Sequence, residues 1–519
     1  MSQAPEPTTL IQPEPTPSRQ LVYTLLIVVA AGLLGGRILA VARVSDPSLY
    51  TDDKWPKVRP NPVPTHGDND RSRWDTIRAL VENRTYAIGT RRKTGLTGSA
   101  QTVFDTWLSG ISHPPTADYV DSGFSTADGW RTIDKILDPQ TLTEDGHVYQ
   151  KFYSSKPPLL PTILAGEYWL LLHGLHWSLE DPNKVFWVVR TILMTVNWLP
   201  FVLSLWILSR VIERIGTSDW GRIFVVATAC FGTLVTPFNT TLNNHTVAAW
   251  SLVFALAPAV AIFTEGRRQP ALFACCGLFA GFLAVTELPA ASLAVLVFLL
   301  LLALAPRQTL IFFLPTLLIP VAAFFATNYL ATGSLKPAYT HFGGPEYEYA
   351  GSHWKLEEGK KNTGIDFAYE HENREVYAFH LLLGHHGAFS LTPVFLLSLA
   401  GLLPCLFGRS EANRRLRWLG ALTLVVSAVV IVFYTALVPA RNRNYGGWSI
   451  GPRWLIWLTP LWLLVMVPAA DWLGRYKWGR GLAYLLLAVS VFSAEFPPWS
   501  PWRHPWLYRL LDELGYIPY

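Results

Sequence analysis

The sequence has 519 residues, of which 50% are hydrophobic and 15% are charged, and its formal net charge is +5. This composition excludes an ordinary soluble domain, because several apolar runs reach the roughly 20 residues that a helix needs to cross a bilayer. No basic face or reader motif indicates nucleic-acid binding. The four cysteines lie within apolar runs, so neither a disulfide framework nor a cysteine metal cluster is expected. The sequence predicts an all-α, polytopic membrane protein.

The first part of the chain is divided into a tail, a span and a long polar loop. Residues 1–20 are rich in Pro, Gln and Thr and are expected to form a disordered cytoplasmic tail. The first span follows, and residues 44–156 form a polar loop. Within this loop an amphipathic helix is predicted after Asp68, because apolar residues recur at helical spacing. These residues are Trp74, Ile77, Leu80 and Val81.

The charges of the short loops determine the expected topology. Ten further apolar runs lie near residues 185–209, 222–238, 246–264, 271–286, 289–305, 309–331, 389–408, 418–438, 454–473 and 481–496. If 157–175 lies along the outer interface, every short loop rich in arginine faces the cytoplasm, as the positive-inside rule requires. If it spans, all of them move outside. We therefore expect eleven spans, with the N-terminus inside.

This topology gives the chain four parts after its tail. We expect a membrane module over 21–335 with the juxtamembrane helix 157–175, and an outer loop over 336–388. C-terminal spans over 389–496 and an outer tail over 497–519 complete the chain. The polar loops meet on the outer side, so an extracytoplasmic site is expected there.

Two acids stand in the first outer loop. Asp68 or Asp70 is a candidate general base for an acceptor hydroxyl or amine. A helix N-cap is the alternative, since Asp and Asn are usual there. Lys156 precedes Pro157-Pro158, and a lone cation on a fixed backbone is suited to a phosphate. A simple helix start is the alternative for this stretch, because proline fits a first turn.

Three outer arginines, Arg441, Arg443 and Arg453, oppose the positive-inside bias. Anion binding explains their retention, because the arginine fork matches phosphate oxygens. Glycines at 446, 447 and 451 allow a close backbone approach to a ligand.

The remaining candidates for substrate binding are weaker. Each has a structural alternative, in which the residue belongs to a polar turn, lies at the membrane interface or stacks on a neighbour. They are Arg71, Asn244, His245, Glu287 and His353. Gly384-His-His-Gly387 is not expected to bind a metal, because adjacent histidines on a helix point in different directions.

Taken together, these motifs resemble the GT-C superfamily of glycosyltransferases, in particular its protein mannosyltransferase and lipid A aminoarabinose transferase type. Gly67-Asp-Asn-Asp-Arg71 corresponds to the acidic motif, and Lys156-Pro-Pro-Leu159 stands unaltered. Val188-Val-Arg-Thr-Ile192 is similar to the arginine-bearing span that follows, and the resemblance covers about residues 21–335. The type usually has an Asp-Glu pair where this chain has Asp68-Asn69-Asp70, so which acid is the base stays open. Gly446 to Arg453 looks like a stretch of many bacterial membrane transferases.

The resemblance implies a GT-C-type fold and transfer of a sugar from a polyprenyl-phosphate donor on the outer side of a membrane, here a bacterial inner membrane. The acceptor is a protein, lipid or glycan, membrane lipid surrounds the protein, and neither a cofactor nor a metal is expected. Asp68 or Asp70 would be the base, and Lys156 with the three outer arginines would hold the donor phosphate. The alternatives are a transporter or flippase of lipid-linked sugars, and a protein similar to O-antigen ligases or polymerases.

Overall fold

The computed structural model describes residues 16–44, 62–93, 119–127, 129–144, 147–355, 364–496 and 500–517. Helices predominate, as predicted. Up to the outer loop they are α1 (Pro17–Ala40), α2 (Asp68–Glu82), α4 (Leu159–Leu175), α5 (Val185–Leu193), α6 (Leu199–Ile215), α7 (Asp219–Phe231), α8 (Val235–Phe238), α9 (Asn244–Glu265), α10 (Pro270–Thr286), α11 (Ala291–Leu304), α12 (Pro306–Gln308) and α13 (Leu314–Thr332). The later ones are α14 (Arg374–Leu382), α15 (Ala388–Leu391), α16 (Leu396–Phe407), α17 (Glu411–Arg415), α18 (Arg417–Val432), α19 (Thr459–Leu473), α20 (Lys477–Glu495) and α21 (Trp506–Glu513).

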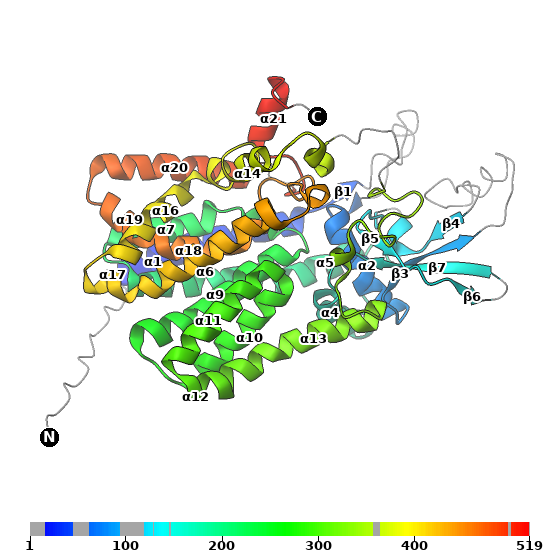
Figure 1. Ribbon diagram of the computed structural model, residues 1–519, viewed down its shortest axis with the longest axis horizontal. Coiled ribbons are helices and arrows are strands. Elements are labelled where there is room, and N and C mark those ends of the chain that lie inside the picture. Colours follow the sequence, from blue (N-terminus) through cyan, green and yellow to red (C-terminus); the bar gives the residue numbers. More distant parts are fainter. Residues whose placement is uncertain are drawn as a thin grey trace.

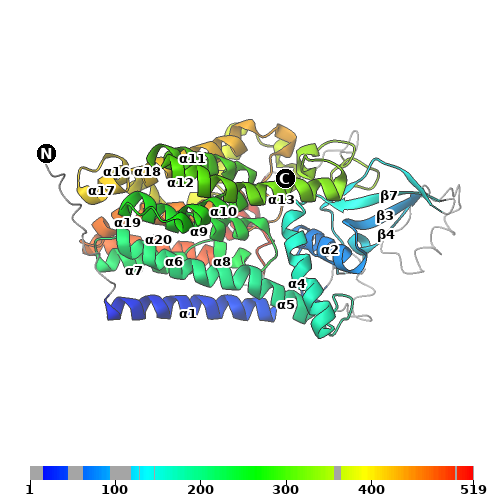
Figure 2. The same ribbon diagram turned by 90° about the horizontal axis from the view of Figure 1, so that it is seen from below.

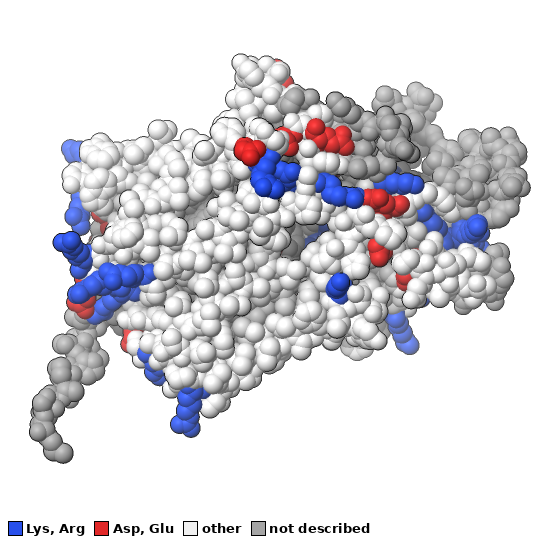
Figure 3. Space-filling view, viewed as in Figure 1, with Lys and Arg blue, Asp and Glu red and all other residues white. Residues whose placement is uncertain are grey.

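The long helices lie side by side along the longest axis of the molecule (Figures 1 and 2). The N-terminus and α17 lie at one end of this bundle, and the strands lie at the other, which we call the outer end. On the face shown in Figure 3, Lys and Arg gather near both ends, and the broad belt between them is almost uncharged. A belt of this kind is expected where a bundle crosses lipid.

Length and composition allow seven described helices to cross a membrane, and these define a multi-pass membrane protein. They cover Pro17–Ala40, Val185–Ile215, Asp219–Phe238, Asn244–Glu265, Pro306–Thr332, Arg417–Leu437 and Arg453–Leu473. Four shorter apolar helices accompany them, at Leu159–Leu175, Pro270–Thr286, Leu288–Leu304 and Pro393–Phe407. The expected total of eleven spans stays a prediction.

The centre of the bundle is formed by α9 and the segment Arg453–Leu473, which contains α19. In their most apolar stretches 78% and 89% of the residues are buried, against 22% in Pro306–Thr332 at the periphery. Apolar side chains that remain exposed over a whole helix face are stable where the solvent is lipid. The peripheral helices therefore present their apolar faces to the bilayer.

An antiparallel sheet corrects the prediction of an all-α chain. Its strands are β3 (Ala87–Lys93), β4 (Tyr119–Ser122), β5 (Lys135–Leu137), β6 (Leu142–Glu144) and β7 (His147–Ser154). The order is β4-β3-β7-β5, β6 also pairs with β7, and Thr90 lies opposite Lys151. A separate two-stranded pair joins β1 (Arg43–Val44) to β2 (Pro62–Val63). Ile88 and Phe152 pack against Ala79 of α2, so the sheet is fixed to that helix. Because β7 ends at Ser154, the sheet positions Lys156.

The first helix begins earlier than predicted, so residues 17–20 belong to α1 and not to a disordered tail. Thr16 is the N-cap, and its hydroxyl accepts a hydrogen bond from the backbone N–H of Arg19. The buried guanidinium of Arg19 forms ion pairs with Glu213 (2.5 Å) and Asp219 (2.7 Å). These pairs join α1 to α6 and α7. Residues 1–15 lie outside the described part of the chain.

Helix α4, predicted not to span, lies across the direction of the bundle at its outer end (Figure 2). The buried Tyr168 of this helix donates a hydrogen bond to Glu82 of α2 (2.7 Å). Its first residue, Leu159, packs with Val285 and Phe324. A crosswise direction is expected of an interfacial helix; its depth in the membrane stays a prediction.

Candidate functional site

Asp70 is one of two acids at the start of α2, and it closes the helix N-terminus. Its carboxylate accepts hydrogen bonds from the backbone N–H groups of His66 (2.8 Å) and Gly67 (2.6 Å). Asp70 is only 1% exposed, and burial raises the pKa of its carboxyl although these N–H groups oppose the rise. The capping alternative therefore describes the role of Asp70 in the fold.

Asp68 has a different environment, because it is half-buried and faces the loop before β5. Its Oδ1 accepts a hydrogen bond from the backbone N–H of Ile133 (2.8 Å), and its carbonyl accepts one from the hydroxyl of Thr132 (2.8 Å). These contacts fix the carboxylate in one direction without enclosing it completely. Asp68 is thus the more exposed acid of the pair.

Lys156 lies at the outer end of the bundle, where it already has a carboxylate partner. Its Nζ is 2.9 Å from Oδ1 of Asp134. Ser72 Oγ of α2 (2.6 Å) and the backbone N–H of Ser155 (3.0 Å) both donate to the carbonyl of Asp134. Burial lowers the pKa of Lys156, and the charge of Asp134 opposes this change. The pair is therefore held rigidly between α2 and the end of β7.

Arg73 lies at the centre of the site, with neutral partners. Its guanidinium donates to the carbonyl and the side-chain oxygen of Asn69 (both 2.6 Å) and to Oδ1 of Asn244 (2.6 Å). Asn244 in turn donates to Glu287 (2.6 Å), which also bonds to Nδ1 of His245. Three predicted residues, Asn244, His245 and Glu287, are thus brought together with Arg73. Burial lowers the pKa of Arg73 to about 10.

The outer loop brings His353 to the edge of the same site. Its Nε2 is 3.4 Å from Oδ2 of Asp366. Burial lowers the pKa of His353, but Asp366 and the charges of Asp68 and Asp134 raise it by more, so the net pKa lies above its ordinary value. An imidazole in this position can donate a hydrogen bond to a substrate beside Asp68.

The three outer arginines have different environments. Arg441 is exposed and forms an ion pair with Glu348. In contrast, Nε and Nη1 of both Arg443 and Arg453 are buried, and they have no hydrogen-bond partner within the described part of the chain. Arg453 also lies over the ring of Trp502, with 5.1 Å between its Cζ and the ring centroid.

Gly446 makes room for Arg453. Its φ is +85°, a conformation that favours glycine, and a Cβ placed there would be 2.3 Å from Nε of Arg453. The charges of Arg453 and Arg73 both act to lower the pKa of Lys156, after the larger effect of burial. The three cations therefore share one region of the outer end.

A small pocket opens beside this region. Its wall is polar near Arg73 and apolar along α4 and α10. The lining residues are Arg73, Pro157, Leu159, Leu160, Asn244, Phe282, Val285 and Thr286. One pocket thus joins a buried guanidinium to a surface suited to a hydrocarbon chain.

This geometry adds to the sequence expectations for Arg71, and for two residues that were not predicted. Arg71 bonds to the Thr65 hydroxyl (3.3 Å) and to the Arg131 carbonyl (3.4 Å), so its guanidinium supports the loop. Asp134 and Arg73 are central to the site, yet neither was among the predicted site residues. Asp134 lies in a polar loop without a recognisable motif, and only the pairing with Lys156 marks it.

No protein-family model and no curated protein sequence matches this chain. Among solved structures, it is similar to the oligosaccharyltransferase of Archaeoglobus fulgidus in the apo form, with a TM-score of 0.42, 12% identity, and coverage of 96% of this chain and 60% of that one. For AglB of the same organism with an inhibitory peptide and a dolichol-phosphate, the TM-score is 0.41, the identity 11%, and the coverage 97% and 60%. For the enzyme tethered to an acceptor peptide with an NVT sequon, the values are 0.41, 12%, 94% and 56%. The chain spans about 60% of the length of the first of these proteins, and a similarity at this level does not define its function.

Proposed function

We propose that this protein is an integral-membrane glycosyltransferase of GT-C type. It transfers a sugar from a polyprenyl-phosphate carrier to an acceptor on the extracytoplasmic side, in a bacterial inner membrane. The observation that carries the proposal is that two buried guanidinium nitrogens of the half-buried Arg453, Nε and Nη1, lack a hydrogen-bond partner among the described residues. The motif resemblance and the position of Asp68 support it.

An anion explains why two buried nitrogens of Arg453 have no partner among the described residues. Burying an ion costs several kcal/mol unless an opposite charge or hydrogen bonds compensate. Asp134 is paired with Lys156, and Glu287 is bonded to Asn244 and His245, so neither carboxylate is committed to Arg453. A lipid-linked phosphate placed among these cations would supply the missing acceptors.

The lipid part of the donor also has a suitable surface. The pocket beside Arg73 continues along Leu159, Leu160 and Phe282. A polyprenyl chain would bury apolar area there while its phosphate faces the guanidinium groups. An arrangement of this kind selects for amphiphilic donors rather than for soluble sugar nucleotides.

The chemistry follows from the placement of Asp68 and the cations. The acceptor oxygen or nitrogen attacks the anomeric carbon, and its proton passes to the Asp68 carboxylate. The bond between the anomeric carbon and the phosphate oxygen breaks, and the electron pair remains on the polyprenyl phosphate. Arg453, Arg73 and Lys156 stabilise the negative charge that develops on this leaving group. This direct displacement inverts the configuration of the sugar.

The proposal is tested by incubating the purified protein with a panel of polyprenyl-phosphate sugars. Release of free polyprenyl phosphate, by transfer or by slow hydrolysis, is the expected result. The same preparation carrying Asp68→Asn should release at least about 10²-fold less, the usual scale for loss of a general base. A transporter would leave every donor intact, and intact donors across the panel would refute the proposal.

A further inference from the structure

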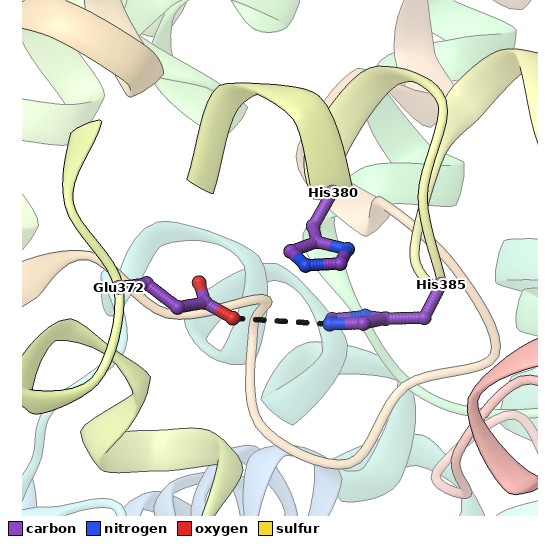
Figure 4. A group of neighbouring side chains, drawn as sticks. All are labelled: Glu372, His380 and His385. Atoms are coloured by element: carbon purple, nitrogen blue, oxygen red, sulfur yellow. Dashed lines mark ion pairs between the residues drawn. The ribbon is translucent and has the colours of Figure 1, made fainter. Parts of the chain in front are cut away.

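A second group of ionisable side chains lies outside this site. Glu372 precedes α14, His380 lies in α14, and His385 lies in the turn that follows (Figure 4). Their potential ligand atoms all lie within 4.8 Å of one another. The expectation that Gly384-His-His-Gly387 lies on a helix is wrong, because it forms a turn between α14 and α15. The argument against a metal there loses its basis.

The geometry of the three side chains is close to that of a metal site. Nε2 of His385 is 3.8 Å from Oε1 of Glu372. The rings of His380 and His385 are stacked, with 3.9 Å between their centroids. Tetrahedral zinc with bonds of about 2.0–2.2 Å places its ligand atoms roughly 3.3–3.5 Å apart. The ligand atoms therefore need to approach by at most about 1.5 Å. The stacked rings also need to turn so that both nitrogen lone pairs face the ion.

Two of the three residues are buried, and one nitrogen of the third, the half-buried His380, is unsatisfied. His385 is 1% exposed and Glu372 is 6% exposed. Nδ1 of His380 is buried and has no hydrogen-bond partner in the described part of the chain. A Cβ at Gly384 would be 2.2 Å from this Nδ1, so the turn brings its backbone close to the ring. Burying the Glu372 carboxylate is costly in an apolar interior, and a cation held between it and the two imidazoles would offset this cost.

Neighbouring groups orient two of the three ligands. Tyr445 donates a hydrogen bond from its hydroxyl to Oε2 of Glu372 (2.5 Å), while Oε1 faces His385. Nδ1 of His385 is 2.5 Å from Nδ1 of His386, and its Nε2 is on the side of Glu372. Metal-binding histidines and carboxylates are commonly oriented in this way by outer hydrogen bonds.

We propose that Glu372, His380 and His385 bind one divalent transition-metal ion of the zinc class. Two imidazole nitrogens and one carboxylate oxygen are suited to zinc, and a water completes the tetrahedron. The ion connects the start of α14 with the turn after it, and Tyr445 extends this connection to the loop that carries Arg453. The inference does not depend on the proposed transferase activity.

The test uses the full-length protein, purified in detergent without a histidine tag. The chain has 13 histidines, so added imidazoles would obscure the count. After treatment with a chelator, the protein is titrated with Zn²⁺, passed through a desalting column and analysed for metal by mass spectrometry. About one zinc per chain is expected, with a higher melting temperature. Co²⁺ in its place should give the visible absorption of a tetrahedral site, a readout that needs no variant.

Three variants assign the site. His385→Gln and Glu372→Gln should each lower the bound zinc at least tenfold and abolish the rise in melting temperature. His353→Gln, in the same outer loop but outside the cluster, should still bind one zinc. If a variant does not fold, the cobalt spectrum of the unaltered protein decides. Two results would overturn the proposal. One is less than 0.1 zinc per chain at micromolar Zn²⁺, about a tenth of the binding expected of a three-ligand site. The other is unchanged zinc binding in folded His385→Gln and Glu372→Gln.

Discussion

Replacing Arg453 with methionine should weaken the binding of the lipid phosphate while leaving the stability of the fold almost unchanged. Methionine keeps much of the side-chain volume and removes the charge. In the complex, the guanidinium would form charge-assisted hydrogen bonds to phosphate, each worth about 1.5–3 kcal/mol. The two buried nitrogens that lack partners, Nε and Nη1, point their N–H groups in different directions, so each is available to donate to a separate acceptor oxygen. A loss of roughly 2–4 kcal/mol in binding is therefore expected, equal to a 30- to 1000-fold weaker affinity.

The stability of the free protein should change little. Arg453 forms no ion pair within the described residues, so its replacement breaks none. The contact with Trp502 is lost, and such a contact is worth about 0.5–2 kcal/mol. Removing a buried charge compensates in the opposite direction. We expect the free energy of unfolding to change by no more than about 1 kcal/mol, within the range of ordinary substitutions.

The assay is the binding of a fluorescent polyprenyl phosphate in mixed micelles, followed by a thermal melt of the same preparation. Arg441→Met is the matched control, since Arg441 is exposed and paired with Glu348. The control should bind within about threefold of the unaltered protein, as expected for a surface ion pair. Equal affinities for Arg453→Met and the control, or a large loss of stability in Arg453→Met, would refute the assignment of Arg453 to the phosphate.

Two further predictions concern the site, one concerns His504 near the C-terminus, and one concerns the topology. Asp70→Ala should lower stability by about 0.5–2 kcal/mol in thermal melts, because a helix cap is lost, whereas its transfer rate per folded molecule should stay far above that of Asp68→Asn. Lys156→Met should destabilise the fold by up to about 3 kcal/mol, because Asp134 is left partly buried and unpaired; adding Asp134→Asn should restore the melting temperature but not donor binding. Burial, with a contribution from the charge of nearby Arg509, lowers the pKa of His504 to about 4. The unfolded chain then binds more protons, so stability should fall by roughly 1–3 kcal/mol from pH 6.5 to 4, and His504→Phe should flatten this dependence in chemical unfolding. A reporter fused to the C-terminus should be accessible from outside; a cytoplasmic signal would mean that 157–175 spans.

The parts of the fold that depend on hydrophobic period were predictable from the sequence. Trp74 and Ile77 recur at helical spacing, and both are buried on α2. The sheet was missed because its short strands carry charges. Arg91 lies in β3, yet it is buried between the Asp121 carboxylate (2.7 Å) and the ring of Tyr119 (3.6 Å). Half-buried strands are recognised by the alternation of apolar and polar residues. A charged residue that is buried by tertiary partners breaks this alternation.

The site was predictable only as a set of loops on one side. Positive-inside reasoning placed Lys156 and Arg453 on the same side of the membrane, and the structure brings the two residues into one region. Which cation has a carboxylate partner depends on distances between segments far apart in the chain. Asp134 pairs with Lys156, and Arg453 has no such partner among the described residues. No local sequence pattern carries that information.

Among the described residues, Arg73 and Arg453 lack the carboxylate partners that Arg19 and Arg91 have, and this contrast favours a ligand beside them. At the end of the bundle opposite the strands, Arg19 is paired with the carboxylates of Glu213 and Asp219, as expected where a charge serves the fold. At the outer end, Arg73 bonds only to uncharged groups of the described chain, and Arg453 has buried nitrogens without acceptors. A fold selected for stability alone would replace such groups with apolar side chains at little cost. Their retention beside a pocket with an apolar wall is best explained by an anionic lipid that pairs with them when it binds.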